Sequence, residues 1–204
     1  MESIFPSIGY ERLRMGTDGD GITTLVCAAG CPLRCAYCLN PQSSIEKKPP
    51  VYIFTPESLY EKVKIDALYF LATGGGVTFG GGEPLCYSGF IADFARIAKG
   101  IRINAETSLW ISKKSLRQAA KVIDTFFVDV KDLNPNIYKA YTGRDAEPVY
   151  ENLKLLADLV PAERVIIRLP LIKGYNCDAD RDKSEEKLRN LGYSKFDRFE
   201  YIIK

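Results

Sequence analysis

The chain has 204 residues, of which 46% are apolar and 26% charged, with a formal net charge of +2. This balance predicts one globular domain, residues 1–204, and because Lys and Arg are spread along the chain we expect neither nucleic acid nor a membrane as partner. No histidine occurs, which excludes Ser-His and Cys-His nucleophile pairs, His-ligated zinc and imidazole proton shuttles.

The N-terminus carries no hydrophobic signal core, and no apolar run is long enough to span a bilayer. We therefore expect a cytoplasmic protein. The six cysteines of the chain are then expected to be thiols or metal ligands rather than disulfides, because the cytoplasm is reducing.

Apolar, β-branched segments alternate with amphipathic segments along the chain. The candidate strands are residues 21–30, 75–81, 101–108, 125–132, 164–171 and 197–204. The candidate helices are residues 55–72, 90–100, 113–123, 150–160 and 182–192, the first with Thr55 as its N-cap and Pro56 at its first position. Strands that alternate with helices predict βαβ units around a parallel sheet, an α/β fold that binds ligands beyond the carboxyl ends of its strands.

Three cysteines, Cys31, Cys35 and Cys38, follow directly on the first candidate strand. Their spacing, C-x3-C-x2-C, also fits one face of a helix, but Gly30 and Pro32 indicate a wrapped loop. Thiolates are soft ligands for zinc or iron–sulfur clusters. Structural zinc needs four closed ligands, and the sequence offers no partner pair to complete them. Three thiolates on a four-iron cluster would leave one iron open, and we favour this interpretation.

A glycine run, Gly80, Gly81 and Gly82, ends the second candidate strand and is followed by Glu83 and Pro84. A flexible turn is the plain interpretation. Glycines also let a backbone approach a ligand closely, and Pro84 favours an extended conformation for Glu83. The exposed carbonyls and the Glu83 carboxylate are suited to an ammonium group.

Charged side chains stand at the ends of two later strands. Alternation along residues 125–132 places Phe127, Asp129 and Lys131 on one face. An ordinary ion pair would explain the two charges but not their position, which indicates a wet or ligand-filled cavity. Arg168 lies near the end of the fifth candidate strand in the same way.

The cysteine spacing, with Tyr37 before the last cysteine, and the GGEP sequence at residues 81–84 resemble the signature motifs of radical S-adenosylmethionine (SAM) enzymes. The resemblance implies a partial (β/α)6 barrel and a [4Fe-4S] cluster on Cys31, Cys35 and Cys38, with SAM bound to the open iron. It implies SAM-binding roles for Tyr37, Gly80, Gly81, Gly82, Glu83, Thr107, Asp129, Lys131 and Arg168.

Within these roles the resemblance distinguishes several contacts. Glu83 and its glycines would receive the SAM amino group, and Asp129 would bind the SAM ribose or a cation beside it. Lys131 would neutralise the SAM carboxylate, and it is grouped with the three cysteines as catalytic.

Residues 15–24, 105–108, 129–143 and 168–176 resemble, in order, segments of glycyl-radical-enzyme activating enzymes, and among them the pyruvate formate-lyase activating enzymes. This resemblance covers nearly the whole chain. It implies that a 5′-deoxyadenosyl radical removes a hydrogen atom from a glycine of a partner glycyl radical enzyme, with flavodoxin or ferredoxin as electron donor. It also implies a monovalent cation at Glu106, Thr107, Asp129 and the carbonyl of Phe127, and a place for Asp18 near the partner's glycine loop.

The chain departs from this group at several points. Only Cys86 and Cys177 follow the cysteine motif, so we expect no ferredoxin-like insertion and a single cluster. Leu109 stands where a glycine is common. The chain ends at Lys204 without the closing segment and the SAM-contacting histidine of relatives, so we expect SAM to be held less fully or a partner to cover that side. Cys27 is interpreted, with Cys86 and Cys177, as a packing or surface thiol.

Two alternatives stay open. A radical SAM enzyme could act on another peptide or on an RNA, although the modest charge argues against tRNA. A non-catalytic iron–sulfur or zinc module would explain the cysteines, but it leaves Glu83, Asp129 and Lys131 unexplained.

Overall fold

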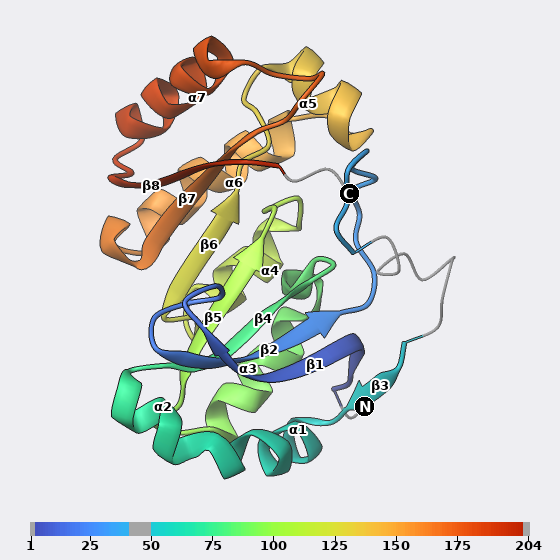
Figure 1. Ribbon diagram of the computed structural model, residues 1–204, viewed down its shortest axis with the longest axis vertical. Helices are drawn as coiled ribbons and strands as arrows, with labels where there is room; N and C mark the ends of the chain where they lie inside the picture. The colour runs from blue at the N-terminus through green and yellow to red at the C-terminus, as the bar shows by residue number, and fades with distance from the viewer. Residues whose placement is uncertain (1–2, 41–49, 202–204) are drawn as a thin grey trace.

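The computed structural model describes residues 3–40 and 50–201, and their strands form one eight-stranded sheet (Figure 1). The strand order is β3-β1-β2-β4-β5-β6-β7-β8. The strands from β2 onward in this order pair in parallel: β2 (Ile22–Ala28), β4 (Gly76–Gly81), β5 (Arg102–Thr107), β6 (Thr125–Asp129), β7 (Val165–Leu171) and β8 (Lys195–Glu200). These strands correspond to the six predicted ones. Residues 202–204 of the last predicted strand lie outside the described residues.

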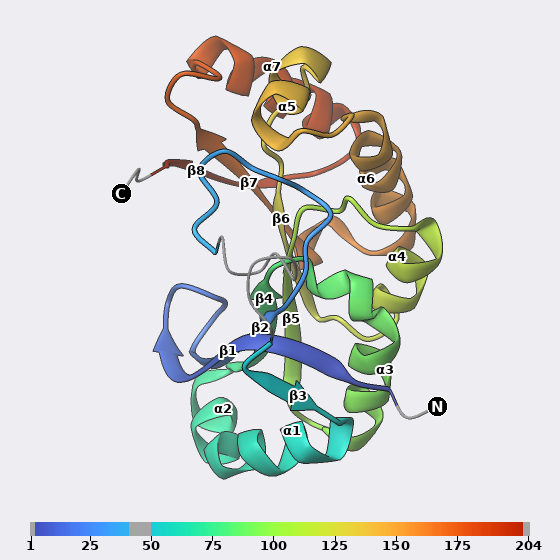
Figure 2. The same ribbon diagram turned by 90° about the vertical axis from the view of Figure 1, so that its right-hand side faces the viewer.

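Helices connect successive parallel strands, as predicted. They include α3 (Ser88–Ile97), α4 (Lys113–Ala119), α6 (Glu147–Leu159) and α7 (Asp178–Asn190). Figure 2 shows α3, α4 and α6 along one side of the sheet. The buried core fills this side, where side chains such as Val77, Phe94 and Leu153 are fully enclosed. Burial of these apolar faces fixes the sheet against its helices.

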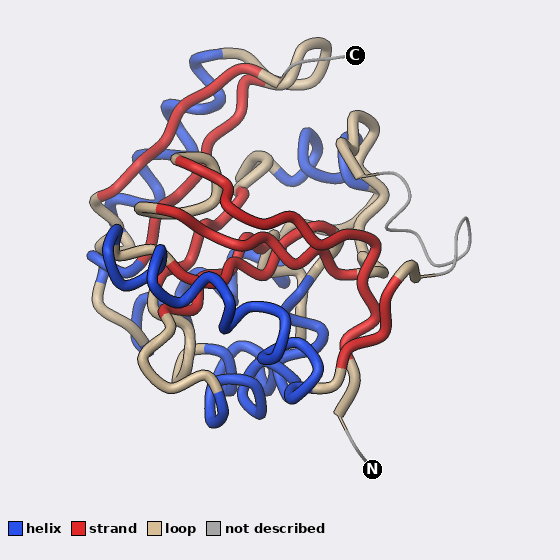
Figure 3. The backbone as a smooth tube through the Cα atoms, turned by 60° about the horizontal axis from the view of Figure 1, so that its bottom comes forward, coloured by secondary structure: helices blue, strands red, loops and turns tan. Residues whose placement is uncertain are grey.

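The sheet does not close on itself. Its edge strands, β3 (Tyr52–Phe54) and β8, lie at opposite ends of the molecule in Figures 1 and 2, and Figure 3 shows the strands as an open arc with helices outside it. The predicted α/β fold with a partial, open barrel is confirmed. Among the described residues, no helix combines the length and apolar character that crossing a membrane would need.

Two strands were not predicted. β1 (Phe5–Met15) pairs antiparallel with β2, and β3 pairs antiparallel with β1. The register of β1 against β2 shifts twice, between Ser7 and Gly9 and between Glu11 and Arg14. Such bulges break the strict alternation by which a strand is recognised in a sequence.

The first predicted helix is split in two. α1 (Pro56–Val63) starts as predicted, because Thr55 caps it and exchanges hydrogen bonds with Ser58. A 3₁₀ turn, Lys64–Asp66, then separates it from α2 (Ala67–Thr73). Asp66 in this turn is fully buried and accepts two hydrogen bonds from Arg12 of β1, at 2.8 and 2.7 Å. This long-range contact is not encoded in the local apolar pattern.

A short helix, α5 (Pro135–Thr142), was also missed. Its end signals are present in the sequence. The Asn134 side chain accepts from the amide of Asn136 at 3.0 Å, Pro135 occupies the first turn, and Gly143 ends the helix with φ +70°. This helix supports the cysteine loop.

Candidate active site

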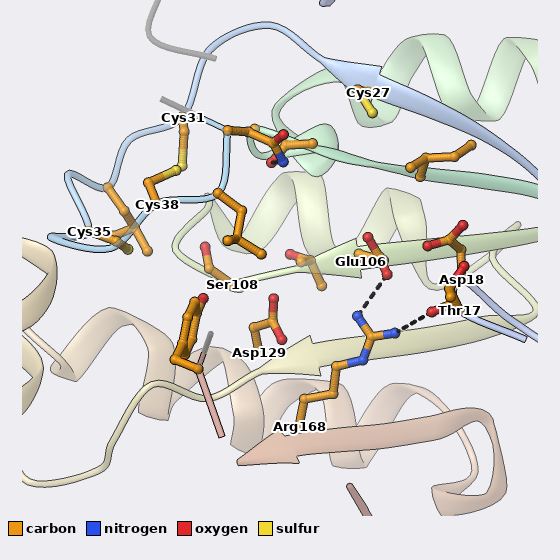
Figure 4. A pocket seen from close by; sticks show the side chains of 18 of the residues that line it. Thr17, Asp18, Cys27, Cys31, Cys35, Cys38, Glu106, Ser108, Asp129 and Arg168 are labelled. Atoms are coloured by element: carbon orange, nitrogen blue, oxygen red, sulfur yellow. Dashed lines mark hydrogen bonds and ion pairs between the residues drawn. The ribbon is translucent and has the colours of Figure 1, made fainter. Parts of the chain in front are cut away.

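A cavity of about 610 Å³ opens at the carboxyl ends of the parallel strands (Figure 4). This is the size of pockets that hold small ligands and cofactors. The predicted site residues that line it are Asp18, Cys31, Cys35, Cys38, Gly81, Gly82, Glu106, Thr107, Asp129, Lys131 and Arg168. Four others, Tyr37, Gly80, Glu83 and Phe127, are not among the lining residues. The structure therefore brings most of the predicted residues to one cavity.

The three clustered cysteines lie on the loop after β2, at one end of the cavity (Figure 4). Cys31 and Cys35 are half-buried and Cys38 is exposed. Burial raises the pKa of Cys31 to about 12 and also raises the pKa of Cys35. Burial thus favours the protonated form of these two thiols, and a bound metal would supply the positive charge that favours the thiolate.

This donor set fits a [4Fe-4S] cluster. Thiolates are the ligands of such clusters, and three from one loop leave one iron for another ligand. In the described part of the chain, no three ligating side chains converge closely enough to hold one metal ion. A cluster does not require such convergence, because each cysteine binds a different iron.

The glycine run lies against the strand and loop that carry the cysteines. A Cβ on Gly81, whose φ is +90°, would lie 2.7 Å from the Cα of Cys27, and one on Gly82 would lie 2.1 Å from the carbonyl oxygen of Gly30. The amides of Gly82 and Glu83 donate to the carbonyls of Ala28 and Gly30, at 3.0 and 2.9 Å. Because they lack a Cβ, the glycines let the backbone at the end of β4 lie directly against the backbone at the end of β2. This role in packing is separate from any contact with a ligand.

Glu83 differs from the expectation of a carboxylate facing the ligand. It is fully buried, and its Oε1 accepts from Thr107 Oγ1 at 2.7 Å and from the Leu85 amide at 3.2 Å. Its Oε2 accepts from the amide and the hydroxyl of Ser108, at 2.8 and 2.7 Å. Burial raises the pKa of Glu83, while the hydrogen bonds from Ser108 and Thr107 oppose that shift. In this structure the carboxylate joins the end of β4 to the end of β5.

Glu106 and Arg168 face each other across the cavity. Arg168 Nη1 donates to Glu106 Oε1 at 2.7 Å, and its Nη2 donates to the carbonyl of Thr17 at 3.2 Å (Figure 4). The guanidinium also lies 4.7 Å from the ring centroid of Phe127. Burial raises the pKa of Glu106, and Arg168 partly offsets this shift. Phe127 therefore supports Arg168 from the same face of β6 that carries Asp129.

Asp129 and Lys131 form the second charged pair of the cavity. Lys131 Nζ lies 3.5 Å from Asp129 Oδ2 and donates to the hydroxyl of Tyr201 at 2.9 Å. Burial by itself would lower the pKa of Lys131, but Asp129, Tyr201 and Cys35 together outweigh it and keep the pKa well above its usual value. Lys131 is therefore a fixed positive charge, 7% exposed, at the cavity wall.

Several lining residues were not predicted. Cys27, interpreted as a packing thiol, lines the cavity, whereas Cys86 and Cys177 are exposed as expected. Tyr201 and Ser108 also line it, and Arg14 lines it while pairing with Asp18. Side-chain alternation along β2 places Cys27 on the same face as Leu25, which also lines the cavity, and could have identified it. No local signal identifies Tyr201, which reaches Lys131 across the sheet.

Leu109 occupies a conformation that suits glycine. Its φ is +57°, in the left-handed region, although its side chain is fully buried. The turn is fixed by hydrogen bonds from the Leu109 amide to Thr107 Oγ1 at 3.0 Å and from Asn152 Nδ2 to the Leu109 carbonyl at 2.9 Å. Burial of the side chain thus offsets a strained backbone at this position.

We expect Leu109→Gly to destabilise the protein, because losing a buried Leu costs about 2–5 kcal/mol and relieving the left-handed strain returns only about 1–2 kcal/mol. Leu109→Ala loses nearly the same side chain and keeps the strain. The glycine variant should therefore be more stable than the alanine variant by about 1 kcal/mol, the reverse of the usual order. Urea unfolding of both variants measures this difference, and an alanine variant of equal or higher stability would contradict it.

Comparisons with known proteins identify the family of this chain. The model of the Radical SAM superfamily matches residues 25–188. The (2S)-3-sulfopropanediol dehydratase activating enzyme of Klebsiella oxytoca is 27% identical over 223 residues, covering 79% of this chain and 69% of the relative. The pyruvate formate-lyase-activating enzyme of Clostridium pasteurianum is 33% identical over 147 residues, covering 70% and 59%.

Among solved structures, Streptococcus suis SuiB bound to S-adenosylmethionine matches with a TM-score of 0.65 at 14% identity. The match covers 84% of this chain and 38% of that one. At this identity the similarity concerns the fold alone.

Proposed function

Because the chain belongs to the radical SAM superfamily, we propose that it is an activating enzyme that generates a glycyl radical on a partner enzyme. One observation carries the proposal. The cysteine loop and the charged ends of β5, β6 and β7 open into the same cavity of about 610 Å³, and the relatives described above are activating enzymes of such partners.

In this proposal Cys31, Cys35 and Cys38 hold a [4Fe-4S] cluster and the cavity holds SAM. When bound, the cluster would pass one electron from an external donor to SAM, which would give methionine and a 5′-deoxyadenosyl radical able to take a hydrogen atom from a glycine Cα. The protein orients the bound groups and limits the access of water. No general base is required, consistent with a chain without histidine.

In this proposal each charged side chain of the cavity contacts a different part of SAM or a cation beside it. Lys131 neutralises the SAM carboxylate, since its charge is fixed by Asp129 and held by Tyr201. Arg168 contacts SAM from β7. Asp129 contacts the ribose or, with Glu106, Thr107 and the Phe127 carbonyl, a monovalent cation.

The SAM amino group is assigned to the glycine run. Gly81 and Gly82 line the cavity, while the Glu83 carboxylate is enclosed by four donors. Glu83 then acts by ordering Thr107 and Ser108, and the backbone of Gly81 and Gly82 receives the ammonium group. Tyr37 packs against Tyr175, with ring centroids 5.6 Å apart, and supports the loop from behind.

The proposal includes a cytoplasmic location, a low-potential electron from flavodoxin or ferredoxin, and a partner loop that enters beside Asp18. Asp18 is held by Arg14 and by a hydrogen bond from Thr78 Oγ1 to its carbonyl at 2.5 Å.

The first test is anaerobic reconstitution with iron and sulfide, followed by SAM and dithionite. We expect 5′-deoxyadenosine and methionine in equal amounts. Incubation with proteins of the source organism that end in a glycyl-radical motif should then give a glycine-centred doublet in the EPR spectrum for one of them. Formation of 5′-deoxyadenosine without any doublet would favour another peptide or RNA substrate, and no 5′-deoxyadenosine would favour a non-catalytic module.

A further inference from the structure

The cysteine loop is fixed to the C-terminus of α5. The amide of Arg34 donates to the carbonyl of Thr142 at 2.9 Å, and the amide of Ala36 donates to the carbonyl of Tyr141 at 3.0 Å. The last carbonyls of a helix have no partner within it, so the loop satisfies two of them. Because these two amides flank Cys35, the position of that cysteine is tied to α5.

Tyr138 lies one turn earlier on the same helix and is 1% exposed. Its ring packs in the core, but its hydroxyl has no hydrogen-bond partner among the described residues. A buried hydroxyl without a partner destabilises the folded protein, because the hydrogen bonds that it made to water are lost. Such a group in a native protein needs an explanation, and a ligand that binds beside it is one.

The attachment of the cysteine loop to α5 points to that ligand. Cys35 lies between the two amides that bond to the last turn of α5, so this cysteine is held at the end of the helix that carries Tyr138. In addition, burial raises the pKa of Tyr138, Cys35 adds to this rise, and Lys131 opposes it.

We propose that the Tyr138 hydroxyl donates a hydrogen bond to the Cys35 sulfur when the cluster is bound. This inference rests on the cluster of the proposed function. Hydrogen bonds to the ligand sulfurs help to set the reduction potentials of iron–sulfur clusters. A donor stabilises the reduced cluster, which carries one more negative charge, so Tyr138 is a positioning residue that raises the reduction potential.

Tyr138→Phe tests the proposal, because it removes only the hydroxyl. In the reconstituted protein, we expect about a tenfold smaller equilibrium constant for one-electron reduction, equivalent to about 59 mV toward more negative potential. An EPR-monitored redox titration measures it. The cluster-free variant should unfold at the same temperature as the wild type or higher, because the lost hydroxyl has no partner there.

Tyr193→Phe is the matched control. Tyr193 is also buried, but its hydroxyl donates to the carbonyl of Leu153 at 2.6 Å. This variant should keep the wild-type potential and unfold at a lower temperature than the wild type, because the Leu153 carbonyl loses its donor. The two tyrosines are thus expected to show opposite patterns of potential and stability.

A spectroscopic signature adds a second readout. After exchange into D2O, the reduced wild-type cluster should show a coupled deuteron by electron–nuclear double resonance that is absent from Tyr138→Phe. An unchanged potential and an unchanged deuteron signal in the variant would overturn this inference alone. A wild-type protein that assembles no cluster would overturn the proposed function as well, so the two failures are distinguishable.

Discussion

Cys35→Ala should abolish both the iron–sulfur absorbance and the formation of 5′-deoxyadenosine in the anaerobically reconstituted protein. Removing one of three thiolates leaves two ligands for the cluster. Mutation of a residue that only contacts a metal ligand weakens metal binding by roughly 10–100-fold, and loss of a ligand itself should weaken it by more. Iron and sulfide analysis, with chromatographic quantification of 5′-deoxyadenosine, measures the loss. Cys31→Ala and Cys38→Ala should give the same result.

Cys86→Ala and Cys177→Ala are the matched controls, since both cysteines are exposed and neither lines the cavity. They should retain the iron content and the activity of the wild type. If Cys35→Ala kept its cluster, or if Cys86→Ala lost it, the assignment of the three ligands would be wrong.

The parallel strands could be predicted because each one is a short apolar run followed by a helical pattern. Such strands are buried on both faces, as the neighbouring residues Val77 and Thr78 of β4 are, and their composition is therefore a strong local signal. The same strands position most of the site, because the ends of neighbouring parallel strands meet at one edge of the sheet. Asp129 and Arg168, for example, are paired in register across β6 and β7.

What could not be predicted depends on contacts between distant segments. β1 is irregular because its bulges fit it to β2, and the α1–α2 break encloses Asp66 against Arg12. The burial of Glu83 is set by Ser108, 25 residues later in the chain. A sequence motif indicates which residues matter, but not which of them faces the ligand and which supports its neighbours.

Glu83→Gln should destabilise the cluster-free protein although it changes the shape of the side chain very little. Each carboxylate oxygen of Glu83 accepts from one backbone amide, that of Leu85 or that of Ser108. An amide side chain has one oxygen and one NH₂ group. In either orientation, the NH₂ group therefore faces a backbone N–H that cannot become an acceptor.

Leaving such a buried donor unsatisfied costs about 1–3 kcal/mol, which corresponds to roughly 2–4 °C in Tm for each kcal/mol in a chain of this size. Glu186→Gln is the matched control, because it makes the same chemical change at an exposed side chain of α7; we expect a smaller change in Tm. The Tm of the cluster-free Glu83→Gln variant distinguishes two roles for Glu83, support of neighbouring residues and direct contact with SAM. If Glu83 supports Thr107 and Ser108, its variant loses stability without any ligand present. A carboxylate whose only role is to bind the SAM amino group would leave the Tm of the cluster-free protein unchanged and weaken SAM binding alone, and this result would refute the positioning role.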